Sequence, residues 1–328
     1  MSVDADWPLI DAHVHVYPAS AWGRRRTHDH AIQEYGTADV HYPTGQTGTI
    51  DDVVDTTAVA GLSHAVVLNL FEPHRWRADV EEKADGLSEQ LRISTTPGQY
   101  LVDLNDWLCT AAISRPQLLP VIAIDPTALA PQELADHVEH FVRERGAAGV
   151  KLHPILQRVW PHDARLNGVW ELCADLQVPA VIHSGVARAG PQFAAPAAFE
   201  TLATSFPRLR AVIAHLGGAA WRETVVVAKR HPGFWFDCSE MVSWLGAPRA
   251  PRLDEFVRTV RAVGVERVLY GSDYPWYAPA DGIRRLREMN AFSPSERELI
   301  LGANAAHVFS RALASNHRRA YDMSRRRN

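Results

Sequence analysis

Two histidines stand at alternate positions in the apolar stretch "IDAHVHVYP", which runs from residue 10 to residue 18. Successive side chains of a β-strand point to opposite faces, so His13 and His15 would share one face, about 7 Å apart along the strand. Two imidazoles on one wall are suited to binding a metal ion. They are equally typical of half-buried histidines that hydrogen-bond to their neighbours, so the interpretation depends on whether the chain supplies more ligands.

The elements that would position these side chains form a regular series along the chain. Eight short apolar segments of strand length begin at Leu9, His64, Leu118, Gly149, Pro179, Leu209, Phe234 and Arg267. Most are continuous runs of Val, Ile, Leu and Ala, which is typical of parallel strands covered on both faces. Helical patterns with clear start and stop residues lie between them, such as the segment from Pro131 to Gly146. This alternation predicts an α/β protein with a single (β/α)8 TIM barrel over residues 1–314.

Two long connections, residues 17–48 and 72–100, follow the first and second predicted strands. On a barrel they would extend from the carboxyl ends of those strands and act as insertions that line or cover the active-site mouth. The first insertion contains a basic run from Arg24 to Arg26, which we expect to be a solvated loop rather than an anion site. Residues 315–328 are basic and lack apolar periodicity, which predicts a flexible tail.

The bulk composition is that of an ordinary globular protein, with 46% hydrophobic and 22% charged residues in 328. The 34 basic and 38 acidic residues give a formal charge of -4, which provides no reason to bind nucleic acid or acidic membranes and favours a small-molecule substrate. Three widely spaced cysteines, no basic signal region and no long apolar run predict a cytoplasmic protein with reduced thiols. A homodimer stays open, because nothing in the sequence reports the oligomeric state.

Polar residues gather where the predicted strands end. They are His13, His15, Lys151, His153, His183, His215 and Asp273. Because catalytic groups of a barrel come from the carboxyl ends of its strands, we expect these side chains to converge. Buried unpaired charges are costly, so such a group calls for a metal ion to organise it. Imidazole and carboxylate ligands together suit zinc, iron or manganese.

Six segments resemble, in the right order, the amidohydrolase superfamily of metal-dependent barrels. They are "IDAHVHV", "GVKLHP", "VIHSG", "HLGG", "LYGSDYPW" and "ILGANAAHVF", and the resemblance extends from Leu9 to Phe309. More narrowly, they are similar to the amidohydrolase-2 group. That group contains hydrolases and metal-dependent decarboxylases related to aminocarboxymuconate semialdehyde decarboxylase.

The resemblance implies a role for each residue of this constellation. His13, His15, His183 and Asp273 would hold a single divalent metal ion, zinc in the first place, with manganese or iron as alternatives. His215 would stand beside the metal-activated water and orient it or shuttle a proton. In hydrolytic members Asp273 would also act as the base.

Lys151 and His153 are the members whose roles stay most open. Related binuclear enzymes carry a carboxylated lysine that bridges two metals after the fourth strand, and Lys151 lies in the fourth predicted strand. His153 follows two residues later on the same strand face. We expect this pair to bind substrate or to support the ligands, and the site to hold one metal rather than two.

These residues support three functions. The first is hydrolysis of a lactone, ester or amide of a small molecule by metal-activated water. The alternative is a metal-dependent, non-oxidative decarboxylase of an aromatic or enoic acid, which would use almost the same residues. "GVKLHP" favours the hydrolase, because the decarboxylases of the group usually lack this stretch. The third is a metal-binding barrel without activity, which the complete set of expected ligands disfavours.

Overall fold

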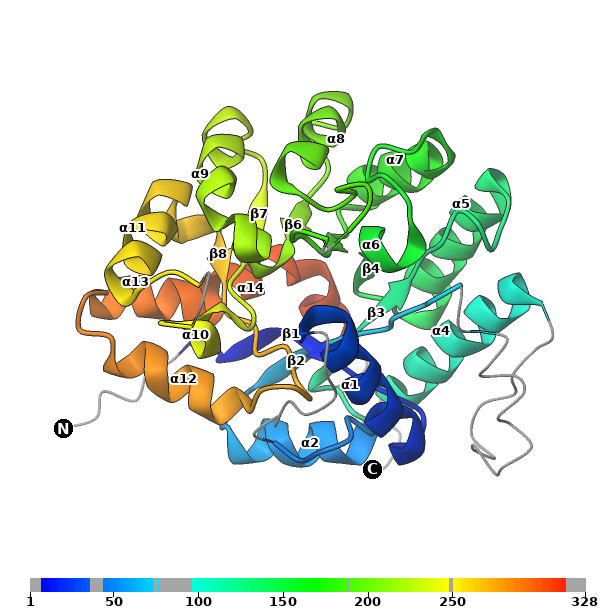
Figure 1. Cartoon of the computed structure of the whole chain (residues 1–328). Helices are drawn as coiled ribbons and strands as arrows, with labels where there is room; N and C mark the ends of the chain where they lie inside the picture. Colours follow the sequence, from blue (N-terminus) through cyan, green and yellow to red (C-terminus); the bar gives the residue numbers. More distant parts are fainter. Residues whose placement is uncertain are drawn as a thin grey trace.

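The computed structural model describes residues 7–35, 44–73, 76, 96–187, 189–247 and 250–316. Within them, one eight-stranded parallel sheet pairs its strands in sequence order from β1 to β8. The sheet closes on itself because Val14 of β1 bridges to Tyr274, just after β8, and the Ala12 N–H donates to the Tyr270 carbonyl at 2.9 Å. The structure therefore confirms the predicted (β/α)8 barrel (Figure 1).

All eight predicted strands are present, and the apolar runs that predicted them are buried. They are β1 Ile10–His15, β2 His64–Leu68, β3 Leu118–Ala123, β4 Gly149–Leu152, β5 Ala180–Ile182, β6 Ala211–Ile213, β7 Trp235–Asp237 and β8 Val268–Leu269.

The described α-helices occupy two kinds of position. They are α1 Ser20–Tyr35, α2 Ile50–Val59, α4 Pro97–Ile113, α5 Pro131–His140, α6 Pro154–Gln157, α7 Asn167–Leu176, α8 Glu200–Ser205, α9 Trp221–Arg230, α10 Met241–Trp244, α11 Leu253–Val263, α12 Pro279–Glu288, α13 Pro294–Glu298 and α14 Asn304–Val308. Helices α2, α4, α5, α7, α9, α11 and α12 surround the strands, whereas α1, α6 and α10 lie inside this ring in the view of Figure 1. These three follow the carboxyl ends of β1, β4 and β7, which is the end of a barrel that carries active sites.

Local sequence explains where several of these helices begin. Thr49 caps α2 by accepting the Asp52 N–H, and the Asp52 side chain accepts the Thr49 N–H in return. Thr96 caps α4 in the same position, and Pro97 follows at the start of the helix, where its missing N–H costs nothing.

The interior of the barrel is apolar at one end and polar at the other. Strand residues such as Ile10, Val66 and Val181 pack against Val308 and Phe309 from the C-terminal helices. This cluster closes one end of the barrel. The chemistry-bearing side chains therefore lie at the opposite end, where the strands finish.

The basic run from Arg24 to Arg26 is not the solvated loop that the sequence predicted. The three residues lie within α1, and the Arg26 side chain is only 7% exposed and forms an ion pair with Glu72 at 2.7 Å. Trp22 is buried one helical turn earlier on the same face, so Arg26 belongs to the buried face of α1, whereas Arg24 is exposed.

Parts of both predicted insertions and most of the predicted tail, residues 317–328, lie outside the described residues. Among the helices that the structure describes, none has the length and apolar character needed to cross a membrane.

Candidate metal centre

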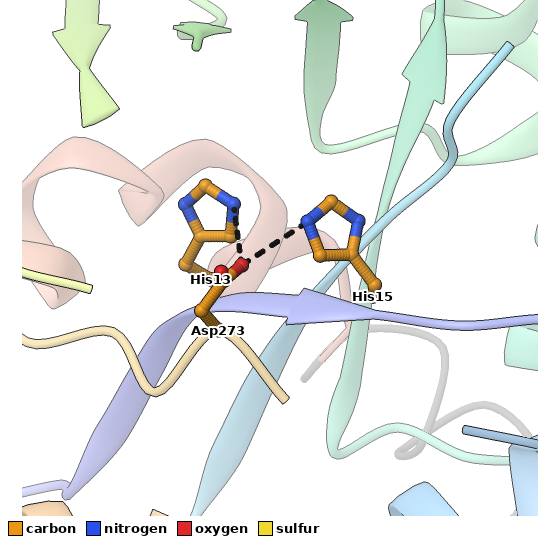
Figure 2. A group of neighbouring side chains, drawn as sticks. All are labelled: His13, His15 and Asp273. Carbon is orange, nitrogen blue, oxygen red and sulfur yellow. Dashed lines mark ion pairs between the residues drawn. The ribbon is translucent and has the colours of Figure 1, made fainter. Parts of the chain in front are cut away.

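His13, His15 and Asp273 form a compact buried group at the polar end of the barrel (Figure 2). One nitrogen or oxygen of each lies within 4.8 Å of the others. The Asp273 Oδ1 atom is 3.2 Å from His15 Nε2 and 3.4 Å from His13 Nε2. Barrel closure produces this proximity, because the Asp273 N–H donates to the His13 carbonyl at 3.0 Å and so fixes the end of β8 beside β1.

The donor atoms of this group fit a divalent cation. His13 Nε2 and Asp273 Oδ1 are buried and have no hydrogen-bond partner among the described residues. Burial lowers the pKa of His13 and of His15, which keeps both imidazoles neutral. Burial alone would raise the pKa of Asp273, but its contacts with His15 and with the other nearby imidazoles lower it below its ordinary value. Neutral imidazoles beside a carboxylate are the ligands that zinc and manganese take in proteins.

Asp237, at the end of β7, sets the orientation of His13. Its Oδ2 atom lies 2.9 Å from His13 Nδ1. An ionised carboxylate can only accept, and the pKa of Asp237 is lowered because two histidines and Ser239 outweigh the effect of its burial. His13 therefore carries its proton on Nδ1 and directs the lone pair of Nε2 toward Asp273, as in carboxylate–histidine–metal arrangements.

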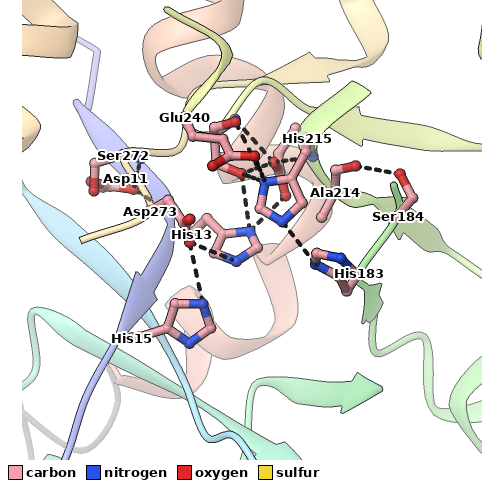
Figure 3. A network of polar contacts seen from close by, with 12 residues as sticks. Asp11, His13, His15, His183, Ser184, Ala214, His215, Glu240, Ser272 and Asp273 are labelled. Atoms are coloured by element: carbon pink, nitrogen blue, oxygen red, sulfur yellow. Dashed lines mark hydrogen bonds and ion pairs between the residues drawn. The ribbon is translucent and has the colours of Figure 1, made fainter. Parts of the chain in front are cut away.

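A chain of hydrogen bonds leads from Asp237 to the two remaining histidines (Figure 3). The Ser239 hydroxyl donates to Asp237 Oδ1 and lies 2.8 Å from His215 Nδ1. Since the single hydroxyl proton is used, His215 donates from Nδ1, and its Nε2 accepts from His183 Nδ1 at 3.1 Å. His183 is left with a lone pair on Nε2. It lies outside the group of three, and its role as a fourth ligand stays a prediction.

Both residues predicted to be catalytic have a strained backbone conformation. His215 and Asp273 have φ of 58° and 62°, a region that costs a non-glycine residue about 1–3 kcal/mol. Specific hydrogen bonds hold them there. The His215 N–H donates to Asp237 Oδ1 at 2.9 Å, and Asp11 Oδ1 accepts the N–H groups of His13 and Ser272.

Lys151 and His153 share a strand face but differ in their access to the site. Lys151 is 1% exposed, and its Nζ atom has no hydrogen-bond partner among the described residues. Burial lowers the pKa of Lys151 to about 8, partly offset by Asp237 and Asp273. His153 stacks on His183 with ring centroids 3.8 Å apart, and its Nδ1 accepts the Leu156 N–H. Direct binding of substrate by either residue stays a prediction, as does a single metal.

A cavity opens beside the metal group, and most of the predicted site residues line it. Its polar lining comprises His15, His153, His183, His215, Asp273, Tyr17, Arg26, Asp29, Glu72 and Glu240, and its apolar walls include Leu70, Ile155, Leu156, Val186, Trp244 and Trp276. Trp276 places its ring against His15, with centroids 5.1 Å apart and planes at 82°.

Sequence reasoning missed several residues that shape this site. Tyr17 continues the alternation of His13 and His15, and this spacing was a signal that could have revealed it. Ser239 was missed as well, although it stands two residues after Asp237, for which the sequence favours a supporting rather than a catalytic role. Glu240 gave no comparable signal, because its place in the cavity depends on a backbone turn with φ of 54°.

A parallel barrel with two histidines and an aspartate grouped at the ends of its strands defines a TIM-barrel protein with a candidate metal centre. The model of the amidohydrolase family matches residues 99–311, so the chain belongs to this family. A search of curated proteins found no match.

Solved structures share the fold at low sequence identity. An uncharacterised TIM-barrel protein from Bordetella bronchiseptica is 19% identical, with a TM-score of 0.68 over 93% of this chain and 99% of that one. A 5-carboxyvanillate decarboxylase from Novosphingobium aromaticivorans with bound manganese is 14% identical, with a TM-score of 0.65 over 94% and 97%. A 4-oxalomesaconate hydratase from Rhodopseudomonas palustris is 15% identical, with a TM-score of 0.61 over 96% and 99%.

Proposed function

We propose that the protein is a metal-dependent decarboxylase that removes carbon dioxide from an aromatic or enoic acid without an oxidant. One observation carries the proposal: the cavity places His15 and Asp273 of the metal group beside apolar side chains that include Trp244 and Trp276. The decarboxylases among the structurally similar proteins, two of them with bound manganese, support the same reaction class.

The cavity walls suit a flat, conjugated acid. Trp244 and Trp276 offer aromatic surface, and Leu70, Ile155 and Leu156 exclude water from the space beside the metal group. A bound divalent cation would supply the positive charge that orients the substrate carboxylate or an adjacent oxygen. In a water-poor cavity a carboxylate is poorly solvated, which favours its loss as neutral carbon dioxide.

His215 is the residue placed to handle the proton. Decarboxylation breaks the bond between the substrate carbon and its carboxylate, leaves the electron pair on that carbon and requires a proton there. The Ser239 bond fixes the His215 tautomer, so Nε2 is the nitrogen that can take up a proton and pass it on. Burial lowers the pKa of His215 to about 4, so its protonated form gives up the proton readily.

Hydrolysis is the second candidate, because the same His215 nitrogen could accept a proton from an attacking water. The argument from "GVKLHP" that favoured hydrolysis is weaker in the structure. Of its two polar residues only His153 lines the cavity, whereas Lys151 is buried and is not part of the lining.

The two reactions differ in their products, and one experiment separates them. The protein, loaded with manganese or zinc, is incubated in ¹⁸O-labelled water with hydroxybenzoic and enoic acids, and in parallel with lactones, esters and amides. We expect carbon dioxide from at least one acid, with a proton from solvent on the former carboxyl-bearing carbon. Labelled acid from a lactone, ester or amide, with no carbon dioxide from any acid, would overturn the proposal.

Matched variants connect the reaction to the site. Replacing His215 by asparagine removes the proton-handling nitrogen and should lower turnover by about 10²-fold or more. The control is His64→Asn, since His64 lies at the start of β2, the opposite end of that strand from the site. The control should retain wild-type turnover.

A further inference from the structure

Tyr17 presents an unpaired hydroxyl to the substrate cavity. Its side chain lines the cavity and is 5% exposed, and its Oη atom is buried without a hydrogen-bond partner among the described residues. Leaving a buried hydroxyl unpaired costs about 1–3 kcal/mol, so such a group calls for an explanation. A partner that arrives with the substrate would provide one.

The ring of Tyr17 is held firmly enough to aim this hydroxyl. The Tyr17 N–H donates to the Gly48 carbonyl at 2.7 Å. The backbone of two glycines also packs close to the ring, because a Cβ atom added at Gly23 or Gly48 would lie 3.2 or 3.1 Å from Tyr17 Cδ2. The hydroxyl is therefore positioned before substrate binds, which reduces the entropy lost on forming a hydrogen bond.

An ion pair completes the polar surface around Tyr17. Arg26 and Glu72 line the same cavity and lie 2.7 Å apart, with side chains 7% and 13% exposed. Arg26, Glu72 and Asp273 of the metal group line the same cavity as Tyr17, and a tyrosine hydroxyl is ordinarily protonated at neutral pH. The hydroxyl can therefore donate to a substrate group that lies in the cavity with both the ion pair and the metal group.

The charges around this surface decide which substrate group it suits. Arg26 and Glu72 offset each other, and Asp29 adds a further carboxylate to the cavity lining. A second carboxylate on the substrate would face these acids, and like charges at close range are unfavourable. An uncharged hydroxyl can accept from Tyr17, which gives the Tyr17 hydroxyl a partner, and it can also donate to Glu72.

We propose that Tyr17 and the Arg26–Glu72 pair form a specificity subsite that binds a hydroxyl substituent of the substrate and rejects a second carboxylate. The inference rests on the proposed function in taking the substrate to be an acid whose first carboxylate lies at the metal group.

Binding of small acids tests the subsite without turnover. Isothermal titration calorimetry on the manganese-loaded protein would use benzoate, the three monohydroxybenzoates and isophthalate as probes. We expect the best hydroxybenzoate to bind about tenfold more tightly than benzoate, and isophthalate to bind more weakly than that hydroxybenzoate. Tyr17→Phe should weaken the hydroxybenzoate by about five- to tenfold and leave benzoate within about twofold.

Two further variants control this result. Tyr100→Phe makes the same change at a tyrosine that is 2% exposed and is not part of the cavity lining, and it should bind every probe as the wild type does. The double variant Arg26→Met, Glu72→Gln removes the ion pair without leaving one charge alone, and it should reduce the discrimination against isophthalate.

The possible outcomes separate the subsite from the reaction. Loss of the hydroxybenzoate preference in Tyr17→Phe supports the subsite even if no acid releases carbon dioxide, a result that would count against the proposed function alone. Unchanged hydroxybenzoate binding by Tyr17→Phe overturns the subsite even if carbon dioxide is released. Isophthalate binding as tight as the best hydroxybenzoate, or no binding by any probe, would also overturn it.

Discussion

Replacing Asp237 by asparagine should weaken metal binding although Asp237 is not one of the proposed ligands. In the wild type, Asp237 Oδ1 accepts from the His215 N–H at 2.9 Å, from the Ser239 N–H at 3.0 Å and from the Ser239 hydroxyl. Because all three are donors, the asparagine carbonyl must occupy this position. The amide NH₂ group is then forced to face His13 Nδ1, which now has to accept rather than donate.

This reversal moves the His13 proton to Nε2, the nitrogen that faces Asp273. A protonated nitrogen cannot bind a metal ion, so binding would have to break the new hydrogen bond or rotate the ring. Losing such a supporting contact typically costs 10–100-fold in metal affinity, which corresponds to about 1.4–2.8 kcal/mol. We expect the dissociation constants of zinc and manganese to rise by about that factor in Asp237→Asn.

Competition with a chromophoric chelator measures this change directly. Asp125→Asn is the matched control, because Asp125 is another fully buried carboxylate, whose Oδ1 accepts from Thr127 and which does not line the cavity. Circular dichroism would establish that both variants remain folded. A folded Asp237→Asn protein with wild-type metal affinity would refute the assignment of the His13 tautomer.

Three further predictions follow from single contacts. Gly271→Ala should reduce metal affinity in the same competition assay, because the new Cβ would lie 2.7 Å from His13 Cβ and 2.9 Å from Ser239 Cβ. Unchanged affinity would contradict this prediction and would show that β1 can shift to make room for the methyl group. Ser239→Ala should lower turnover by about tenfold or more while metal content measured by mass spectrometry stays the same. The hydroxyl lies 2.8 Å from His215 Nδ1 but 3.3 Å from His13 Nδ1, which keeps its shorter bond to Asp237 at 2.9 Å. An equal loss of metal would contradict that division of roles. Burial lowers the pKa of His137 to about 4, and Asn105 Nδ2 lies 3.0 Å from its Nε2, so the folded state keeps it neutral. In the unfolded chain this histidine takes up a proton near pH 6.5. The free energy of unfolding measured with urea should therefore fall by about 2 kcal/mol between pH 7 and pH 5. In His137→Gln this contribution to the pH dependence should be absent.

The barrel could be predicted because its strands are buried on both faces and therefore read as continuous apolar runs. The segments around Val66, Val181 and Val212 are of this kind, and each lies in a strand at the expected place. The barrel in turn predicts that Asp273 lies beside His13 and His15, because the carboxyl ends of all strands in a closed parallel barrel lie at the same end.

The rest of the site depends on contacts between distant segments, which local patterns do not contain. Arg26 belongs to a run of three arginines, and it faces Glu72 only because the side of α1 that carries Trp22 and Arg26 is buried. The link from Asp237 through Ser239 to His215 spans β7 and the segment after β6, so no sequence spacing reveals it. The choice of substrate could not be predicted either, because the role of Tyr17 depends on the side chains that surround it in the cavity.

Metal content is the most direct test of the central claim that His13, His15 and Asp273 hold a functional metal ion. Protein stripped with a chelator, reloaded with manganese or zinc and passed through a desalting column would be analysed by inductively coupled plasma mass spectrometry. We predict about one tightly bound ion per chain in the wild type, and its loss in folded Asp273→Asn but not in Asp125→Asn. No bound ion in the wild type, two ions per chain, or full retention by Asp273→Asn would contradict the account.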